Sequence, residues 1–316
     1  MKITPETKLN EIYQNPLLKK RAYMLGRFPG FGGIMSSQMK IRTLCNMVKT
    51  WNPESVAEGY QMVIDRAEQK QIFFDIYHDE RAKTTGITAF TLEKKSPFVV
   101  VCAGGGYASV CSMVEAFPVI QKLNEAGYAA FSLQYRCGKD AKAPAPMDDL
   151  AAAIRYILDH AQEFNVETEG YAVMGFSAGG HLAASFGTAS LGYRHYGLTA
   201  PSAMILCYPV ITMGEKTHAG SKNCLLGKKA SAEIIRRYSV EEQITPDYPP
   251  AFVWQFDADN MVPVENTKML VQALEKNHIE HEYVLYPGTI HGAGSGEGTA
   301  AEGWMEQALA FLNSHR

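Results

Sequence analysis

The stretch 171–184, YAVMGFSAGGHLAA, decides the fold, because an apolar strand-like run leads directly into a serine and then into a helix-forming run. The G-x-S-x-G pattern at 175–179 in this context predicts a sharp, strained strand-to-helix turn that exposes the hydroxyl of Ser177. Gly179 leaves room for neighbouring backbone, and the N–H of Ala178 at the helix start can face a developing oxyanion. We therefore predict that Ser177 is a nucleophile; the alternative is a chance match to a short pattern.

A glycine run at 104–106 follows a short apolar strand upstream of the serine. Glycine suits a loop whose N–H groups must approach a carbonyl oxygen without interference from a Cβ atom. Gly105 and Gly106, together with Ala178, are therefore the predicted oxyanion hole, and a flexible turn is the alternative. Tyr107 and Phe176, which adjoin the loop and the serine, are predicted substrate contacts.

The acid and base of a catalytic triad can be assigned from the order of the remaining polar residues. Asp259 follows the apolar run 251–256 and precedes a turn and a helix, and Asp257 is the alternative acid. His291 lies in a loop after the last strand-like run, so the order serine, aspartate, histidine is the one this architecture uses. We predict that His291 is the general base and that Asp259 orients it, with activity falling below roughly pH 6 to 6.5 as an ordinary histidine protonates.

Strand-like and helix-like segments alternate from about residue 71 to the end of the chain. The expected strands cover 71–77, 87–92, 97–102, 128–135, 171–176, 203–208, 251–256 and 281–286, and the expected helices cover 148–164, 178–188, 263–277 and 300–314. This alternation predicts an α/β fold with a mostly parallel central sheet and helices on both faces. Reactive groups in such sheets gather at the carboxyl ends of the strands.

Residues 1–70 predict an N-terminal helical appendage, and 71–316 the catalytic domain. Apolar residues at positions 41, 44, 45 and 48 follow a helical period, and the pairs Asn15-Pro16 and Asn52-Pro53 are typical helix starts. A glycine-rich tetrapeptide at 30–33 divides this region but lacks the strand–loop–helix context of an anion-binding loop. We expect the appendage either to cover the catalytic domain or to mediate homo-oligomerisation.

A second insertion, at about 212–248, contains one expected helix at 231–238 and lies between two strands. This position predicts a lid or cap over the site.

Composition excludes several classes of protein. The chain has 316 residues, 46% of them hydrophobic, and a formal net charge of −3, which argues against a nucleic-acid partner. The first residues lack the apolar run of a secretory signal, and no segment reaches the ~18 apolar residues of a membrane span, so a cytoplasmic location is expected. Six cysteines without a CxxC pair predict buried free thiols in a reducing compartment.

No cofactor or metal site is expected. His78, Asp79 and Glu80 are consecutive, and neighbouring strand residues point to opposite faces, so a solvated turn explains them better than a metal site. The glycine run at 104–106 also lacks the G-x-G-x-x-G spacing of a dinucleotide-binding loop.

From residue 98 to residue 316 the chain resembles the acetyl-xylan-esterase-like, carbohydrate-esterase branch of the α/β-hydrolases. The matching pieces are CAGGGYASV (102–110), LQYR (133–136), PAPMDDLAAAIRYI (144–157), GFSAGGHLAAS (175–185), DADNMVPVENT (257–267) and PGTIHG (287–292). Two positions depart from many members: Ala103 and Gln255 stand where histidine is common. The resemblance implies hydrolysis of short acyl esters, often acetyl groups on sugars.

We therefore expect a cofactor-independent serine carboxylesterase whose partner is a small-molecule ester, plausibly an acetylated sugar or xylo-oligosaccharide. Two alternatives remain at this point. One is a peptidase or amidase on the same fold, against which the small size of the appendage argues. The other is a hydrolase-like binding protein without turnover, against which the complete set of triad residues argues.

Overall fold

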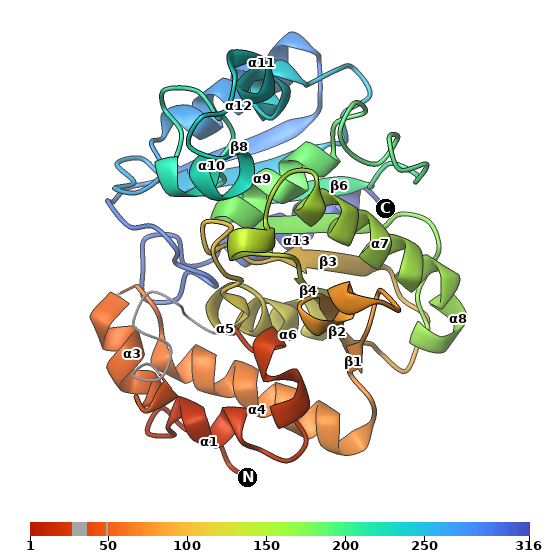
Figure 1. Ribbon diagram of the computed structural model, residues 1–316, viewed down its shortest axis with the longest axis vertical. Coiled ribbons are helices and arrows are strands. Elements are labelled where there is room, and N and C mark those ends of the chain that lie inside the picture. Colours follow the sequence, from red (N-terminus) through yellow and green to blue (C-terminus); the bar gives the residue numbers. More distant parts are fainter. Residues whose placement is uncertain (27–36, 49) are drawn as a thin grey trace.

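The computed structural model describes residues 1–26, 37–48 and 50–316, and its centre is an eight-stranded sheet (Figure 1). The strand order is β1-β2-β4-β3-β5-β6-β7-β8. Strand β2 pairs antiparallel with both β1 and β4, and all other neighbouring strands pair in parallel. The strands are β1 Phe73–Phe74, β2 Gly86–Phe90, β3 Phe98–Cys102, β4 Ala129–Gln134, β5 Ala172–Phe176, β6 Ala203–Cys207, β7 Ala251–Phe256 and β8 His281–Tyr286. The prediction of a mostly parallel sheet is confirmed.

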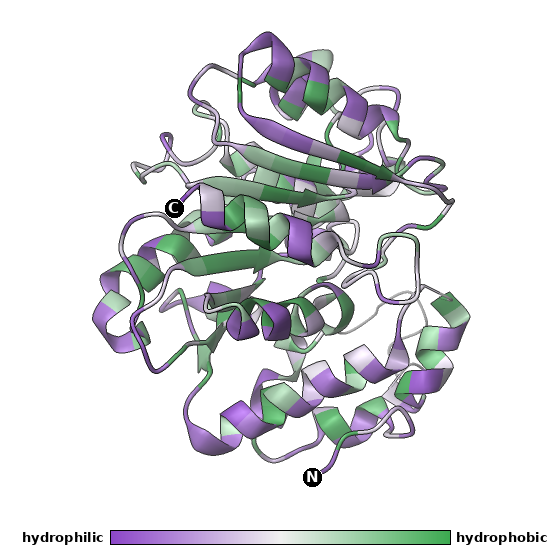
Figure 2. Ribbon diagram, turned by 180° about the vertical axis from the view of Figure 1, so that it is seen from behind, coloured by the Kyte–Doolittle hydropathy of each residue, from purple (hydrophilic) through white to green (hydrophobic). Residues whose placement is uncertain are grey.

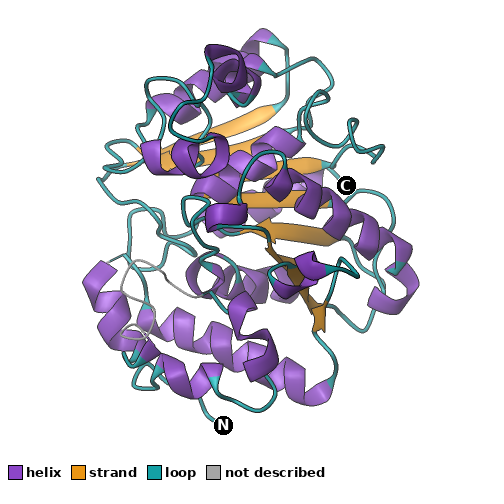
Figure 3. Ribbon diagram, viewed as in Figure 1, coloured by secondary structure: helices purple, strands orange, loops and turns teal. Residues whose placement is uncertain are grey.

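Helices lie on both faces of the sheet (Figure 3). The α-helices are α1 Leu9–Tyr13, α3 Ile41–Val48, α4 Pro53–Gln69, α5 Ser112–Glu115, α6 Phe117–Glu125, α7 Ala145–Asp159, α8 Ala161–Phe164, α9 Ser177–Phe186, α10 Ala219–Leu226, α11 Ala232–Arg237, α12 Glu265–Lys276 and α13 Trp304–Ser314. The short 3-10 helices are η1 Lys19–Met24, η3 Glu80–Lys83, η4 Gly138–Asp140 and η5 Val240–Glu242. Helices α7 and α9 contact each other on one face, and α6 and α13 do so on the other.

The central strands are almost entirely apolar, as buried strands covered by helices on both faces require; Gln255 in β7 is the polar exception. Every residue of β3, β5, β6 and β7 is buried, as expected for the middle of a parallel sheet (Figure 2). The surface helices are amphipathic instead: α7 buries Leu150, Ile154 and Ile157 against the sheet. Packing in the core therefore fixes where each strand ends, and so it fixes the carboxyl edge of the sheet, from which the loops of the site emerge.

Three expectations for secondary structure differ from the structure. No α-helix begins at Pro16; Asn15 Oδ1 instead accepts a hydrogen bond from the N–H of Leu17, and the chain continues into the short helix η1. The first strand is only two residues long. The sequence analysis also left out α5, α6 and α10, of which α6 carries Pro118 in its first turn, where a missing N–H is tolerated.

The N-terminal helices share a single hydrophobic core with the sheet. Helix α4 begins where Asn52-Pro53 predicts, since Asn52 Oδ1 accepts hydrogen bonds from the N–H groups of Glu54 and Ser55. It packs along α6 at the side of the sheet. The division near residue 70 stays a prediction, and the glycine-rich tetrapeptide at 30–33 lies outside the described residues.

No helix in the described part of the chain is both long and apolar enough to cross a membrane.

Candidate active site

Ser177 sits at the turn between β5 and α9, at the carboxyl edge of the sheet. Its backbone φ of +51° lies in the left-handed region that non-glycine residues rarely adopt, so the turn is strained as predicted. A Cβ built on Gly179 would lie 2.1 Å from the carbonyl oxygen of Cys102, so only glycine lets α9 pack this closely on β3. The side chain of Ser177 emerges into a confined space, with 7% of the residue exposed.

The loops after β7 and β8 bring two further polar groups to Ser177. His291 Nε2 lies 2.8 Å from Ser177 Oγ, and His291 Nδ1 lies 2.7 Å from Asp259 Oδ2. These contacts join residues 114 and 32 positions apart in the sequence. The three predicted triad residues therefore form one unbroken hydrogen-bonded path.

Asp259 is held as a pure hydrogen-bond acceptor. Its Oδ1 accepts from the N–H groups of Met261 and Val262, both at 2.9 Å, and its Oδ2 accepts from Gln255 Nε2 at 3.2 Å as well as from His291. Because all four partners donate, the ionised carboxylate is the form that fits. With Asp259 accepting at His291 Nδ1, the histidine carries that proton and presents a free lone pair at Nε2 to the serine.

Gln255, in strand β7, supports this carboxylate from within the sheet. Its amide also donates to the carbonyl of Val262 at 2.7 Å, and its carbonyl accepts from the Thr267 hydroxyl at 2.8 Å. The amide orientation is therefore fixed from both ends. Asp257, the alternative acid, is exposed, and the one hydrogen bond that its carboxylate accepts from the described residues comes from the N–H of Gly288, not from the histidine.

The glycine loop after β3 lies directly against the nucleophile. A Cβ built on Gly104 would lie 2.8 Å from the Ser177 Cβ. Gly105 and Gly106 have φ values of +128° and +64°, and within the described chain their N–H groups donate to no other protein group. Gly105 and Gly106 directly follow Gly104 in this loop, and Ala178 is in the first turn of α9, so their N–H groups remain the predicted oxyanion hole.

Tyr107 and Phe176 are placed in the core, which does not fit the expectation that they contact substrate. Tyr107 is 1% exposed and its hydroxyl lies 2.8 Å from His181 Nδ1. Phe176 is fully buried, and its ring packs against Tyr208 and Trp304. Both side chains are occupied by contacts within the protein, so their closeness to the loop and the serine is one of backbone position.

His181 also lies behind the site, on α9. Its Nε2 donates to the carbonyl of Tyr238 at 2.8 Å, which leaves Nδ1 to accept from the Tyr107 hydroxyl. Burial lowers the pKa of His181 to about 4, so this histidine is neutral at physiological pH.

The segment that was expected to form a cap brings a second histidine near the triad. His218 caps the start of α10, where its Nδ1 accepts from the N–H of Ser221, and a Cβ on Gly106 would lie 3.7 Å from its ring. Burial and then the neighbouring His291 lower the pKa of His218. Because Nδ1 is an acceptor, the proton of the neutral ring is on Nε2, where it can donate to a ligand above the glycine loop.

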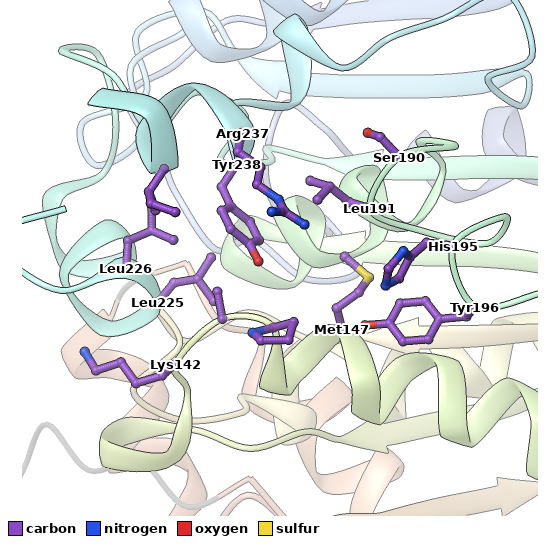
Figure 4. Close-up of a pocket in the computed structure, with 13 residues that line it drawn as sticks. Lys142, Met147, Ser190, Leu191, His195, Tyr196, Leu225, Leu226, Arg237 and Tyr238 are labelled. Carbon is purple, nitrogen blue, oxygen red and sulfur yellow. The ribbon is translucent and has the colours of Figure 1, made fainter. Parts of the chain in front are cut away.

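A cavity of about 400 Å³ lies between helices α7, α10 and α11 (Figure 4). Leu225, Leu226, Met147 and Tyr238 contribute to its lining. No triad or glycine-loop residue borders it, so this cavity is separate from the reacting atoms. Among the described residues, no cluster of three or more His, Cys, Asp or Glu side chains could hold a metal ion.

Two residues around the site were missed in the sequence analysis, Glu115 at the end of α5 and Tyr208 after β6. The Glu115 carboxylate accepts from the N–H of Gly104 at 2.6 Å, and the Tyr208 ring lies edge-on to the His291 ring with 4.9 Å between centroids. A lone carboxylate in the apolar run Val114–Phe117 was the available signal for the first. Nothing in the local sequence distinguishes the tyrosine.

The N-terminal region also contacts this site. Trp51 Nε1 donates to the carbonyl of Gly292 at 3.0 Å, next to His291, and the Ser55 hydroxyl donates to the Glu297 carboxylate. Two residues before and within α4 therefore hold the loop that carries the histidine.

Comparison with known proteins agrees with this architecture. The BD-FAE family model matches residues 88–274, which is more than half of the chain. An endo-1,4-beta-xylanase B of Butyrivibrio fibrisolvens is 33% identical over 230 residues, covering 68% of this chain and 36% of that protein. An acetylxylan esterase of Xylanibacter ruminicola is 30% identical over 241 residues, covering 74% of this chain and 48% of that protein. The chain thus spans a third to a half of these curated relatives.

Solved structures resemble the chain over most of their own length. An acetyl ester-xyloside bifunctional hydrolase from Caldicellulosiruptor lactoaceticus superposes with a TM-score of 0.69 at 29% identity, covering 77% of this chain and 95% of that one. A carboxylesterase from Lactobacillus plantarum gives a TM-score of 0.63 at 28% identity, with coverages of 73% and 92%. The α/β-hydrolase fold that the sequence predicts is therefore confirmed.

Proposed function

This chain belongs to the BD-FAE family, within the α/β-hydrolase superfamily, and from that premise we propose that it is a serine esterase that hydrolyses short-chain acyl esters. The proposed substrates are acetyl esters of sugars or xylo-oligosaccharides. The observation that carries the proposal is the unbroken path from Ser177 Oγ through His291 to Asp259. A binding protein without turnover has no need for that alignment.

In the proposed acylation step, Ser177 Oγ attacks the ester carbonyl carbon while His291 Nε2 removes its proton. The carbonyl oxygen becomes an oxyanion next to the N–H groups of Gly105, Gly106 and Ala178, and each such donor typically contributes on the order of 10²–10³ in rate. His291 then returns the proton to the leaving alcohol, and the acyl group stays on the serine. Asp259 stabilises the imidazolium in between.

In the proposed deacylation step, water takes the position of the alcohol. His291 removes a proton from the water as it attacks the acyl carbonyl, and the same N–H groups bind the second oxyanion. Collapse releases the carboxylic acid and returns the proton to Ser177 Oγ. No cofactor takes part in either step.

Three observations support a small acyl group and a carbohydrate alcohol. Ser177 is only 7% exposed, which favours an acetyl group over a long chain. His218, at the start of α10, offers an Nε2–H donor above the glycine loop, where the hydroxyl groups of a sugar could accept it. Relatives at 29–30% identity are named as an acetylxylan esterase and as an acetyl ester-xyloside hydrolase.

The proposal is tested with nitrophenyl acetate, butyrate and octanoate, followed by acetylated xylo-oligosaccharides and aminoacyl anilides. We expect kcat/KM to fall steeply from acetate to octanoate, acetate release from the oligosaccharides, and no hydrolysis of the anilides. Ser177→Ala should abolish ester turnover. Equal turnover of all three chain lengths would refute the short-chain assignment, and faster hydrolysis of the anilides would make the protein an amidase.

A further inference from the structure

The proposed mechanism leaves one buried carboxylate without a role. Glu115 ends α5, is 4% exposed, and lies beneath the glycine loop. An unpaired buried carboxylate is strongly destabilising, so its partners should reveal what it does there.

Those partners come from the two loops on either side of the reacting atoms. Glu115 Oε2 accepts from the N–H of Gly104 at 2.6 Å, which anchors the first glycine of the loop. Glu115 Oε1 lies 2.9 Å from the hydroxyl of Tyr208, whose oxygen accepts from the N–H of Gly294 at 3.0 Å in the histidine loop. Because the tyrosine oxygen is the acceptor toward Gly294, its hydrogen is free to point at Glu115.

Both carboxylate oxygens of Glu115 are thus acceptors, and the ionised form satisfies every partner. A protonated carboxyl would find no acceptor at Gly104 N–H, and if it donated to Tyr208 the tyrosine's own hydrogen would have no acceptor among the contacts of the described residues. Burial raises the pKa of Glu115 above its usual value, and the charge of His291 and the hydrogen bonds from Tyr208 and Gly104 only partly offset that effect, so the anion depends on these contacts.

The histidine lies next to this group. The ring of Tyr208 packs edge-on against the His291 ring, and a Cβ on Gly292 would lie 3.9 Å from Glu115 Oε1. Besides Asp259, Glu115 and Tyr208, the titratable neighbour of His291 is His218. Around Glu115 the remaining titratable groups are two thiols, of Cys111 and Cys207, whose pKa values burial raises. Among the described residues, Glu115 is therefore a second carboxylate, beside the triad aspartate, whose charge interacts with His291.

We propose that Glu115 is a positioning residue that fixes the glycine loop through Gly104 and, as a buried anion, stabilises the imidazolium that His291 becomes during catalysis. The residue touches no substrate and forms no bond in the reaction. The inference rests on the triad of the proposed function and adds a second carboxylate to it, one that acts through space on the histidine and through a hydrogen bond on the oxyanion loop.

The test is the pH dependence of fluorophosphonate labelling of Ser177, which reports how well His291 takes the serine proton, independent of ester substrate binding and product release. In Glu115→Gln we expect the labelling rate on the plateau above the acid limb to fall about 10-fold, because the imidazolium that forms during proton transfer loses an anion whose stabilisation corresponds to one pKa unit. The acid limb should move to lower pH by at least roughly half a unit, because a histidine loses basicity when a nearby anion is removed. Labelling of the wild-type protein at Ser177 tests the triad itself. Absence of that labelling would therefore refute the proposed function, whereas normal labelling with an unaffected Glu115→Gln variant would refute only the role of Glu115.

Glu241→Gln is the matched control, because Glu241 is a partly buried carboxylate whose pKa burial raises, but it interacts with Thr212 instead of the triad. It should leave both rate and acid limb unchanged. Tyr208→Phe provides a second variant if Glu115→Gln does not fold: it keeps the ring on His291, removes the hydrogen bond to Glu115, and should move the limb in the same direction by less. A loss of rate with an unmoved acid limb, in either folded variant, would overturn the electrostatic role.

Discussion

Replacing Asp259 with asparagine tests the geometry of the triad most stringently, because four donors converge on this carboxylate. They are the N–H groups of Met261 and Val262, the amide of Gln255, and His291 Nδ1–H. Asparagine has one acceptor oxygen, so its NH2 group must face either the two backbone donors or the histidine.

The second orientation is the less costly one. Facing two backbone N–H groups would leave both unsatisfied, at about 1–3 kcal/mol each. Facing His291 removes the acceptor of one long hydrogen bond, from Gln255 Nε2, whose amide keeps its shorter bond to the carbonyl of Val262. It also requires the imidazole to change tautomer, so that Nδ1 accepts and the proton moves to Nε2. That tautomer presents a proton to Ser177 and cannot remove one. We therefore expect Asp259→Asn to lower kcat on the order of 10⁴-fold, about 5.5 kcal/mol in the barrier, with little loss of stability.

The assay is steady-state hydrolysis of nitrophenyl acetate, with urea unfolding of the same samples. Asp257→Asn is the matched control, since this exposed aspartate lies two residues away and should retain nearly full activity. A folded Asp259→Asn protein with more than about a tenth of the wild-type kcat would refute the reasoning. Loss of activity in the Asp257 variant alone would transfer the acid role to that residue.

Three further outcomes follow from the structure. Burial lowers the pKa of His181 to about 4, below the ~6.5 of an unfolded histidine. The free energy of unfolding should therefore be highest above pH 6.5 and fall by about 2 kcal/mol between pH 6.5 and pH 5, because protonation then favours the unfolded chain. Urea unfolding of His181→Gln should show no such dependence on pH. Gly179→Ala should lower the melting temperature sharply or prevent folding, because its Cβ would overlap the Cys102 carbonyl; wild-type thermal stability would contradict the packing. Trp51→Phe should reduce kcat several-fold and stability by about 1 kcal/mol, since the loop bearing His291 loses a hydrogen bond; unchanged kinetics would mean the contact is only structural.

Much of the fold is predictable from the sequence, because its signals are local. Each central strand is a short apolar run, and the strand, G-x-S-x-G turn and helix around Ser177 are contiguous. The segment 112–125 was harder to predict, since two short helices meet there at Ala116 and a proline occupies the first turn of the second. The expected strand at 71–77 is longer than the observed β1, which has two residues, because the flanking apolar residues pack in the core without pairing with another strand.

In the candidate site, too, some residues could be predicted from local sequence and others could not. The triad residues could be named because each follows a strand, and the carboxyl ends of parallel strands meet at one edge. Glu115 and Tyr208 could not, since their significance depends on the glycine and histidine loops approaching each other from opposite sides. Tyr107 and Phe176 show the converse: sequence proximity to the site says nothing of which way a side chain points, and both point into the core.

Isolation of the acyl-enzyme tests the central claim most directly. The protein is mixed with excess nitrophenyl acetate at mildly acidic pH, quenched in acid within the burst of nitrophenol, digested, and analysed by mass spectrometry. We expect one acetyl group on the peptide that contains Ser177, and neither adduct nor burst in Ser177→Ala. An acetyl group on another residue, or undiminished turnover by Ser177→Ala, would contradict that claim.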